Sequence, residues 1–312
     1  MPRDIVGTAS RRALTEIFHR QILIVSIVIE PSAIEIRAID RIEELRNVEA
    51  LQKDVWGCAD LDVVPLTLLL ASHEVGGVLI GAYDESKLVG FVYGFPGYEQ
   101  GRVTHHSHML AVKPAYRNHN VGYKLKLAQR AAVRAQGINR ITWTFDPLQS
   151  LNAHFNFAKL GVIADAYKIN FYGETTSSFL HQFGTDRLWV TWKIDSRRVR
   201  ERVAGKTSTP LADLKRTPCL VDVDADQAPR KDESNLFGGR PHLSIAIPAD
   251  INSLQNRQPD LASSWRKATR WAFTKTMALG YFVEDFYRLP RNGQTVGIYL
   301  LTYRKHTDDS AP

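Results

Sequence analysis

The stretch HHSHMLAVKPAYRNHNVGY, residues 105–123, sets the fold of the chain. Its first half alternates in the manner of a strand. This alternation predicts four side chains on one face of the strand: His106, His108, Leu110 and Val112. Pro114 ends the strand, because proline has no N–H group for the ladder. From Val121 onward apolar residues recur at helical spacing, so the stretch predicts a strand, a short loop and an amphipathic helix.

The loop between strand and helix, residues 117–122, is polar and ends in Gly122. Such a loop can direct several unpaired backbone N–H groups at one point, and the positive end of the following helix adds to them. This arrangement suits a phosphate or a pyrophosphate. An ordinary connection without a ligand is the alternative, since short glycine motifs are common.

The pattern L-A-V-x-P-x-x-R-x-x-N-x-G-x-x-L, residues 110–125, resembles the acyl-CoA loop of the GNAT superfamily of N-acyltransferases. In that family the loop reads Arg/Gln-x-x-Gly-x-Gly/Ala after a strand. Arg117 and Gly122 fit, whereas Asn120 stands where the first glycine is usual. Asparagine is the residue other than glycine that best tolerates a left-handed backbone, so this departure is mild.

The resemblance implies where acetyl-CoA or another acyl-CoA would bind as co-substrate. The end of the strand would hold the pantetheine arm, and a backbone N–H near Leu110 would polarise the acyl carbonyl. The loop and the fourth helix would complete the site. The cofactor-binding residues expected in this way are Leu110, Ala111, Val112, Arg117, Asn118, His119, Asn120, Val121, Gly122, Tyr123, Asn152 and Phe155.

Hydrophobic periodicity beyond this stretch predicts the element order β-α-α-β-β-β-α-β-α-β-β over residues 34–195. This order matches the GNAT fold, an α/β (α+β) architecture with a mixed, mostly antiparallel sheet flanked by helices. A capping box at Asp40 and Glu43 is expected to start the first helix. Outside this domain the chain divides into four further segments: an extension at 1–33 that is disordered or follows an early start codon, a linker at 196–240, a small C-terminal α+β unit at 241–304 and a tail at 305–312.

A second local resemblance covers the fourth helix, where Lys159-Leu160-Gly161 matches the Lys-Leu-Gly of the family. The family commonly places a tyrosine before this motif to protonate the departing thiolate, but here Phe157 occupies that position. Tyr167, Tyr172 or water could supply the proton instead, and Tyr172 is the residue we assign.

Histidine titrates in the range that a general base needs, and His108 lies just before Leu110 on the strand. The resemblance therefore favours His108 as the base that deprotonates the amine. A histidine held by hydrogen bonds in the sheet is the alternative. Asp146 and Glu74 are the reserve candidates.

Arg266 and Arg270 are four residues apart in a predicted helix, and Arg187 lies in a predicted loop. Arginine binds carboxylates in a bidentate manner, whereas a solvated helix face is the plainer interpretation. If functional, these arginines indicate a small acceptor that carries a carboxylate. The substrate-binding residues expected in this way are Glu74, Arg187, Arg266 and Arg270.

Composition sets broader limits. A hydrophobic content of 44% and a charged content of 23% are typical of a soluble globular protein. Cys58 and Cys219 are far apart, which argues against disulfides and fits the cytoplasm. His106 and His108 lack a third ligand, so no metal is expected. No membrane span is predicted.

A net charge of +7 suits an anionic ligand, either a CoA nucleotide or a nucleic acid. We expect no nucleic-acid partner, because aromatic residues are not interleaved with the basic ones in a recognisable motif. A homodimer is left open.

The sequence therefore predicts an acyl-CoA-dependent N-acyltransferase that moves an acetyl or succinyl group to the amine of a small carboxylate-bearing acceptor, such as an amino acid. The resemblance extends to a longer GNAT subgroup with W-T-F-D-P-L, K-L-G, T-D-R-L and W-R-x-x-x-R motifs, which this chain carries. The alternative is a catalytically degenerate GNAT that binds CoA as a regulatory or interaction module, which Phe157 and Asn120 favour.

Overall fold

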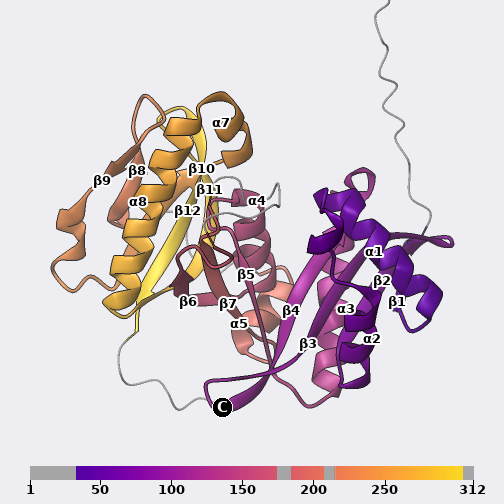
Figure 1. Cartoon of the computed structure of the whole chain (residues 1–312). Coiled ribbons are helices and arrows are strands. Elements are labelled where there is room, and N and C mark those ends of the chain that lie inside the picture. The colour runs from indigo at the N-terminus through magenta and orange to yellow at the C-terminus, as the bar shows by residue number, and fades with distance from the viewer. Residues whose placement is uncertain (1–32, 174–183, 207–213, 215, 305–312) are drawn as a thin grey trace, which may run out of the picture. The chain divides into compact units, whose positions relative to one another are not determined.

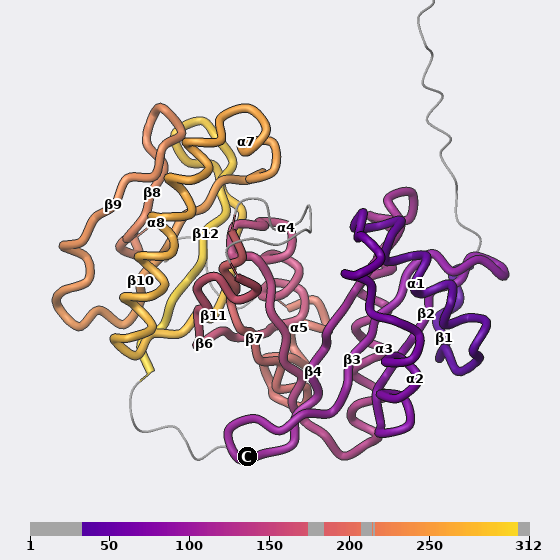
Figure 2. Tube along the Cα trace, in the orientation of Figure 1, coloured from indigo at the N-terminus to yellow at the C-terminus, as the bar shows by residue number. Residues whose placement is uncertain are grey.

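The computed structural model describes residues 33–173, 184–206, 214 and 216–304 (Figures 1 and 2). Contacts divide the chain after residue 31, and all described residues belong to the unit Ser32–Pro312. The expectations for residues 1–33 and 305–312 lie outside the described part, except for residue 33.

The strands form one twelve-stranded sheet in the order β1-β2-β3-β4-β5-β7-β6-β11-β12-β10-β8-β9. Their bounds are β1 Glu35–Ala38, β2 Val78–Asp84, β3 Lys87–Glu99, β4 Arg102–Val112, β5 Arg140–Phe145, β6 Ile163–Lys168, β7 Arg187–Lys193, β8 Cys219–Val223, β9 Pro229–Lys231, β10 His242–Pro248, β11 Tyr281–Arg291 and β12 Gln294–Tyr303. Neighbouring strands are antiparallel except in the pairs β4–β5 and β8–β10. The predicted fold class, a mostly antiparallel mixed sheet with helices, is confirmed.

Helices cover both faces of this sheet (Figure 1). Their bounds are α1 Ile42–Trp56, α2 Leu66–Glu74, α3 Val121–Ala135, α4 Ser150–Ala153, α5 Arg197–Val203, α7 Ile251–Arg257 and α8 Pro259–Ala278. Three single turns of 3₁₀-helix, at Asp60–Asp62, Pro114–Tyr116 and Glu233–Leu236, and a π-helical segment, His154–Leu160, complete the described helices.

Two hydrophobic cores flank strands β2–β4. The apolar stripe of α1, with Leu45, Val48 and Leu51, packs together with Leu69 of α2 against one face. Leu125 of α3 belongs to the core on the other face, which continues into the C-terminal half of the chain. Because the two sets of helices hold β3 and β4 from both sides, the strand stretch first identified in the sequence lies at the centre of this half.

The C-terminal elements continue the same sheet. β11 pairs with β6 through Val283 and Ala164, and α8 packs across β6, β8, β10 and β11 (Figure 1). The interval 196–240 contains α5, β8 and β9, and Val199 and Arg202 of α5 are buried, so part of this interval packs against the rest of the chain. Residues 219–223 form strand β8 within this interval. The domain boundaries at 195 and 241 stay predictions.

The start of α1 differs from the expected capping box. Arg41 is the N-cap residue, and no side chain caps the helix there. Glu44, rather than Glu43, is the acidic residue with a defined partner, since it accepts hydrogen bonds from Arg37 and Arg41. A pairing between the strand before the helix and the helix itself has therefore replaced a purely local cap.

Turn chemistry is closer to expectation. Asn292 and Gly293 have φ angles of 49° and 74° and join β11 to β12, which is the backbone that a tight Asn-Gly hairpin requires. Gly161 ends the fourth helical segment with φ 76°, as a left-handed C-cap. β6 ends at Lys168, and Asn170 then adopts φ 47° and turns the chain.

Candidate active site

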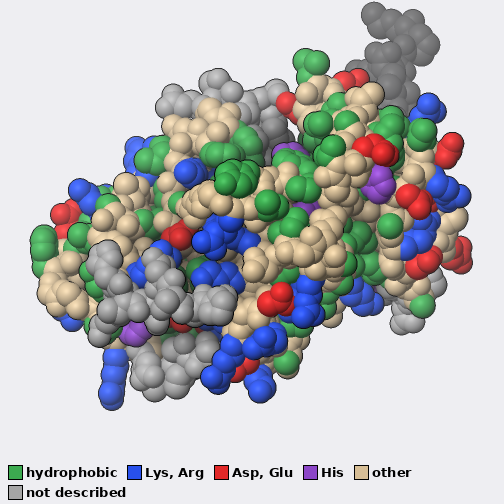
Figure 3. All heavy atoms as spheres, turned by 90° about the horizontal axis from the view of Figure 1, so that it is seen from below, with side chains coloured by type: hydrophobic (Ala, Val, Ile, Leu, Met, Phe, Trp, Pro, Cys, Tyr) green, Lys and Arg blue, Asp and Glu red, His purple; other side chains and the backbone are tan. Residues whose placement is uncertain are grey.

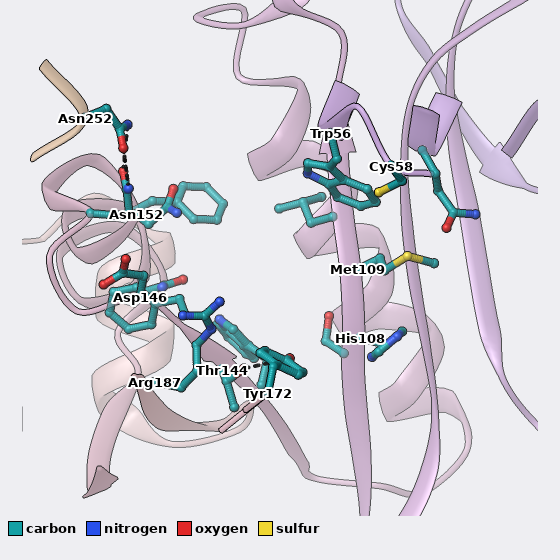
Figure 4. Close-up of a pocket in the computed structure, with 18 of the residues that line it drawn as sticks. Trp56, Cys58, His108, Met109, Thr144, Asp146, Asn152, Tyr172, Arg187 and Asn252 are labelled. Carbon is teal, nitrogen blue, oxygen red and sulfur yellow. Dashed lines mark hydrogen bonds between the residues drawn. The ribbon is translucent and has the colours of Figure 1, made fainter. Parts of the chain in front are cut away.

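The site begins where β4 and β5 separate. These two parallel strands pair only at His105–Ile141 and His106–Thr142. Beyond His106 they diverge, so the backbone of β4 on that side has no strand partner in β5. The space between them is a cavity of about 980 Å³, lined on one side by β4 and the end of α1 and on the other by β5 and the fourth helix (Figure 4).

A bulge in β4 shapes the wall of this cavity. Met109 pairs with Tyr93 and Ser107 with Gly94, which leaves His108 without an opposite residue. Gly94 is needed here, since a Cβ atom on it would lie 2.5 Å from Nε2 of His105 and from the carbonyl oxygen of His106.

The bulge also corrects the predicted alternation of the strand. His108 contacts the ring of Tyr93, on the α1–α2 face, whereas Leu110 packs into the core on the α3 face. The expectation that His106, His108, Leu110 and Val112 share one face is therefore wrong, because one inserted residue shifts every later side chain to the opposite face.

The polar loop before α3 has the geometry of an anion site. Asn118 and Asn120 adopt the left-handed φ angles of 70° and 57°. Residues 117–120 are exposed, and the N–H groups in the first turn of α3, which follows them, have no acceptor within the helix. The tolerance of asparagine for this backbone is confirmed at position 120, and the loop presents exposed backbone at the N-terminus of a helix.

His108 lies in the cavity, as its expected role requires (Figure 4). It is exposed to the cavity, and the walls around it partly desolvate the imidazole, which lowers its pKa below 6.5. Its neighbours on the strand are shifted further, because burial lowers the pKa of His105 to about 3 and that of His106 to about 4. All three imidazoles are thus neutral at pH 7.

Asp146 reaches the cavity but has partners of its own. Both of its carboxylate oxygens accept from the guanidinium of Arg266, at 2.6 and 2.8 Å, and one also accepts from the backbone N–H of Leu148 at 2.9 Å. Burial by itself lowers the pKa of Arg266, but the Asp146 charge outweighs it and the net pKa is raised. As a reserve base Asp146 is less available than His108.

The predicted arginine pair does grip carboxylates, but those of the protein itself. Arg270 donates two hydrogen bonds of 2.8 Å to Asp186, which also accepts from Tyr167. Although burial by itself raises the pKa of Asp186, the bonds from Arg270 and Tyr167 leave it lowered. The solvated-helix interpretation is wrong for Arg266, which is 6% exposed.

Arg187 is the exception among these arginines. Its side chain is buried and points into the cavity (Figure 4), and it donates a hydrogen bond of 2.9 Å to the carbonyl oxygen of Asp186. The Tyr172 ring centroid lies 5.1 Å from its guanidinium carbon. No carboxylate in the described part of the chain forms an ion pair with Arg187. Burial accordingly lowers its pKa.

The remaining expected residues divide into two groups. Leu110, Asn152, Phe155 and Tyr172 line the cavity, with the Tyr172 hydroxyl 3.5 Å from Thr144 Oγ1. Glu74 lies exposed at the end of α2 and does not line it. The hydroxyl of Tyr167 donates to Asp186 outside the cavity lining, so Tyr172 is the better placed of the two tyrosines.

Two features of the site were not expected. Phe157, at the position of the family tyrosine, is fully buried against Phe145 and Tyr299. Lys126 of α3 is buried yet lines the cavity, with its Nζ 3.0 Å from Ser107 Oγ and 2.8 Å from Gln129 Oε1. The sequence could have indicated this burial, because Lys126 directly follows Leu125 and lies at the edge of the apolar face of the helix.

Within the described residues no group of three or more His, Cys, Asp or Glu could hold a metal ion. In the same part of the chain no single helix is long and apolar enough to cross a membrane. Only the pair Ile42–Trp56 and Asp60–Glu74, bent by 115°, meets the length and composition criteria jointly.

The diverging strands, the bulge and the polar loop place a cavity beside the N-terminus of a helix. Residues 41–162 match the model of the acetyltransferase (GNAT) family. This part of the chain belongs to the GNAT superfamily. A comparison with curated proteins found no match.

Solved structures similar to 52% of the chain include three N-acetyltransferases. PaiA N-acetyltransferase from Thermoplasma acidophilum, in complex with coenzyme A, has 17% identity over 99% of its chain with a TM-score of 0.37. Aminoglycoside 6'-N-acetyltransferase from Enterococcus faecium has 20% identity over 98% and a TM-score of 0.39. Ribosomal-protein-S18-alanine N-acetyltransferase from Escherichia coli has 12% identity over 95% and a TM-score of 0.42. At these scores the structures add nothing to the family match.

Proposed function

We propose that the protein is an acyl-CoA-dependent N-acyltransferase whose acceptor is a small amine with a carboxylate, such as an amino acid. The proposal of a carboxylate-bearing acceptor is based on Arg187. Its guanidinium is buried, points into the cavity and has no carboxylate partner in the described residues. An anion that enters the cavity would complete its hydrogen bonds and offset its desolvation.

Acyl-CoA is proposed to bind along β4. The exposed loop and the N-terminal N–H groups of α3 receive the pyrophosphate, and the backbone of β4 beyond His106, which is unpaired on the β5 side, receives the pantetheine arm. Asn152 and Phe155 of the fourth helical segment line the opposite wall. A backbone N–H near Leu110 then polarises the thioester carbonyl.

His108 is proposed to take the proton from the acceptor amine as it attacks. Its pKa is below 6.5, so the imidazole is already neutral at physiological pH and can accept a proton directly or through water. The carboxylate on Arg187 would hold the acceptor in the same cavity as His108 and the thioester.

Calorimetric titration with acetyl-CoA and succinyl-CoA tests the binding site. Gly122→Glu places a carboxylate among the phosphate donors, while its Cβ would meet only Leu110 and Val112 atoms at 3.8 and 3.9 Å, which is ordinary contact. Gly97→Glu is the matched control, since its Cβ would lie 3.9 Å from Thr104 Cγ2, in the β3–β4 hairpin. We expect binding in the wild type and in Gly97→Glu and its loss in Gly122→Glu. No binding of either thioester to the wild type would refute the proposal.

The acceptor class is tested by release of the CoA thiol with a panel of amino acids and the matching amino-acid amides. Turnover of the acids and not of the amides supports the carboxylate. Comparison of acetyl-CoA with succinyl-CoA decides the acyl group, since Arg187 could also receive the distal carboxylate of a succinyl chain.

A CoA-binding module without catalysis is the second candidate, and the burial of Phe157 favours it because the usual thiolate acid is absent at that position. Tight thioester binding without thiol release for any amine would support it. The face in Figure 3 shows Lys and Arg in separate groups among acidic and apolar side chains, so this face gives the nucleic-acid alternative no support.

A further inference from the structure

Lys126 is a buried lysine without a carboxylate partner in the described part of the chain. It lies in the second turn of α3 and is 2% exposed. Its Nζ donates to Gln129 Oε1 and Ser107 Oγ, and it lies 3.8 Å from the ring centroid of Trp143. The three protons of an ammonium thus have two oxygens and one aromatic face to meet.

These surroundings hold the ammonium in place while making its proton easy to give up. Burial lowers the pKa of Lys126 well below 10.5, whereas the two hydrogen bonds and the Trp143 face favour the charged form. The titratable groups that face it are His105 and His106 of β4, and both are neutral at pH 7. Trp192 of β7 is a second aromatic neighbour, at 5.6 Å.

The position of Lys126 complements that of His108. Nζ contacts Ser107, the residue directly before the bulge, from the α3 side of the sheet. His108 contacts Tyr93 on the α1–α2 side. Both side chains line the one cavity, so an acyl group bound beside the bulge would have a base toward one face and an N–H donor toward the other.

We propose that Lys126 is the catalytic acid that protonates the CoA thiolate, a role that rests on the proposed acyltransferase function. The acceptor nitrogen forms a bond to the thioester carbon, and His108 takes a proton from that nitrogen. The C–S bond then breaks, its electron pair goes to sulfur, and a proton passes from Lys126 Nζ to that sulfur. Neutral Lys126 regains a proton from solvent, and His108 returns its proton to solvent.

The assignment explains why Phe157 can be buried. The family position on the fourth helix points into the core between Phe145 and Tyr299, where it can reach no thiolate. Lys126 comes from α3, whose N-terminus carries the donor loop for the phosphates. A general acid in place is worth about 10²–10⁴-fold in rate.

The experiment compares steady-state thiol release from acetyl-CoA across pH in the wild type and in three variants. Lys126→Met keeps a side chain of similar length without the proton. Lys126→Arg keeps the positive charge, but its guanidinium is too weak an acid to donate. Lys267→Met is the matched control, since Lys267 is exposed on α8. The acceptor is an amino acid from the panel or, if none reacts, water.

We expect kcat to fall about 10²-fold in both Lys126 variants, with the KM for acetyl-CoA and its calorimetric Kd unchanged, and no change in Lys267→Met. The wild-type kcat should decline as the pH rises and Lys126 loses its proton, at a pH below the 10.5 of an ordinary lysine, and this decline should be absent in Lys126→Met. Recovery of activity in Lys126→Arg would show a structural cation and would overturn the proposal.

These measurements distinguish a failure of the acyltransferase function from a failure of the role proposed for Lys126. A wild type that neither binds acetyl-CoA nor releases thiol overturns the acyltransferase function and the acid together. An active wild type with an equally active, folded Lys126→Met overturns the acid alone. If Lys126→Met does not fold, by circular dichroism, the alkaline limb of the wild type and the activity of Lys126→Arg still decide the question.

Discussion

At the scale of single residues, the arginines near the cavity are of two kinds. Two form ion pairs within the protein, and one is left to bind a ligand. Arg266 and Arg270 have the bidentate geometry that their sequence spacing suggested, yet Asp146 and Asp186 already occupy them. Arg187 is buried with one backbone acceptor. The difference lies in the neighbours that the fold brings to each guanidinium, and it decides which substitution should affect binding.

Arg187→Met should raise the KM for a carboxylate-bearing acceptor about 10- to 150-fold, because a hydrogen bond to a charged group contributes about 1.5–3 kcal/mol. The KM for acetyl-CoA should stay the same. Steady-state kinetics with the acid and its amide checks this, with Arg288→Met, on an exposed arginine, as control. An equal loss for acid and amide would contradict the carboxylate contact.

His108 should set the acidic limb of the pH profile. A base acts only when unprotonated, and burial lowers the pKa of His108 from 6.5, so kcat/KM should stay level from neutral pH down to below 6.5 and then fall. His108→Gln should lower kcat by about 10²-fold or more and remove this limb. A limb centred above 6.5 in the wild type would contradict the assignment.

At the scale of elements, the site depends on how β4 leaves the sheet ladder. The extra residue His108 places the later side chains of β4 on the opposite face of the sheet. Pairing of β4 with β5 ends after two residues. The wall of the cavity formed by β5 is stabilised by a residue distant in the sequence. Asp146, just after β5, accepts a hydrogen bond from Arg266 of α8. The C-terminal helix therefore supports the cavity without being part of the GNAT match.

Asp146→Asn should destabilise the protein by about 3–5 kcal/mol, since it leaves the buried Arg266 without its counter-charge. Urea unfolding followed by circular dichroism measures this. Asp165→Asn is the control: its partner Arg304 is half exposed, so the loss should be below about 1 kcal/mol. Equal losses in both variants would contradict a structural role for the Asp146–Arg266 pair.

At the scale of the whole molecule, one sheet runs through the GNAT match and the C-terminal unit. Val283 pairs with Ala164, the hydroxyl of Tyr299 donates to the carbonyl of Pro147, and Phe157 packs on Tyr299. One hydrophobic core spans both parts. Separate folding of the two parts would expose that core, which is costly at about 25 cal/mol per Å² of apolar surface.

The full chain should therefore unfold in urea in a single transition, with tryptophan fluorescence and circular dichroism coinciding. Trp143 and Trp192 report on the N-terminal part and Trp265 on α8. Single-tryptophan variants that share one midpoint would support a common cooperative unit. Two separate midpoints would contradict it and favour independent domains at the boundaries predicted from composition.

The sequence by itself determined the elements and the loop. Local signals were sufficient there: the hydrophobic periodicity of α1 and α3, the glycine and asparagine turns at Gly161 and Asn292, and the polar loop ending in Gly122. Each depends on backbone preferences of a few neighbouring residues, which a single chain displays directly.

Only the tertiary structure decided what those elements bring together. A bulge at His108 places the earlier and later side chains of β4 on opposite faces, and burial lowers the pKa of Lys126. Ion pairs across about a hundred residues occupy Arg266 and Arg270 while leaving Arg187 for the cavity. These outcomes depend on long-range packing and desolvation, which arise from contacts between segments distant in the chain and have no local pattern.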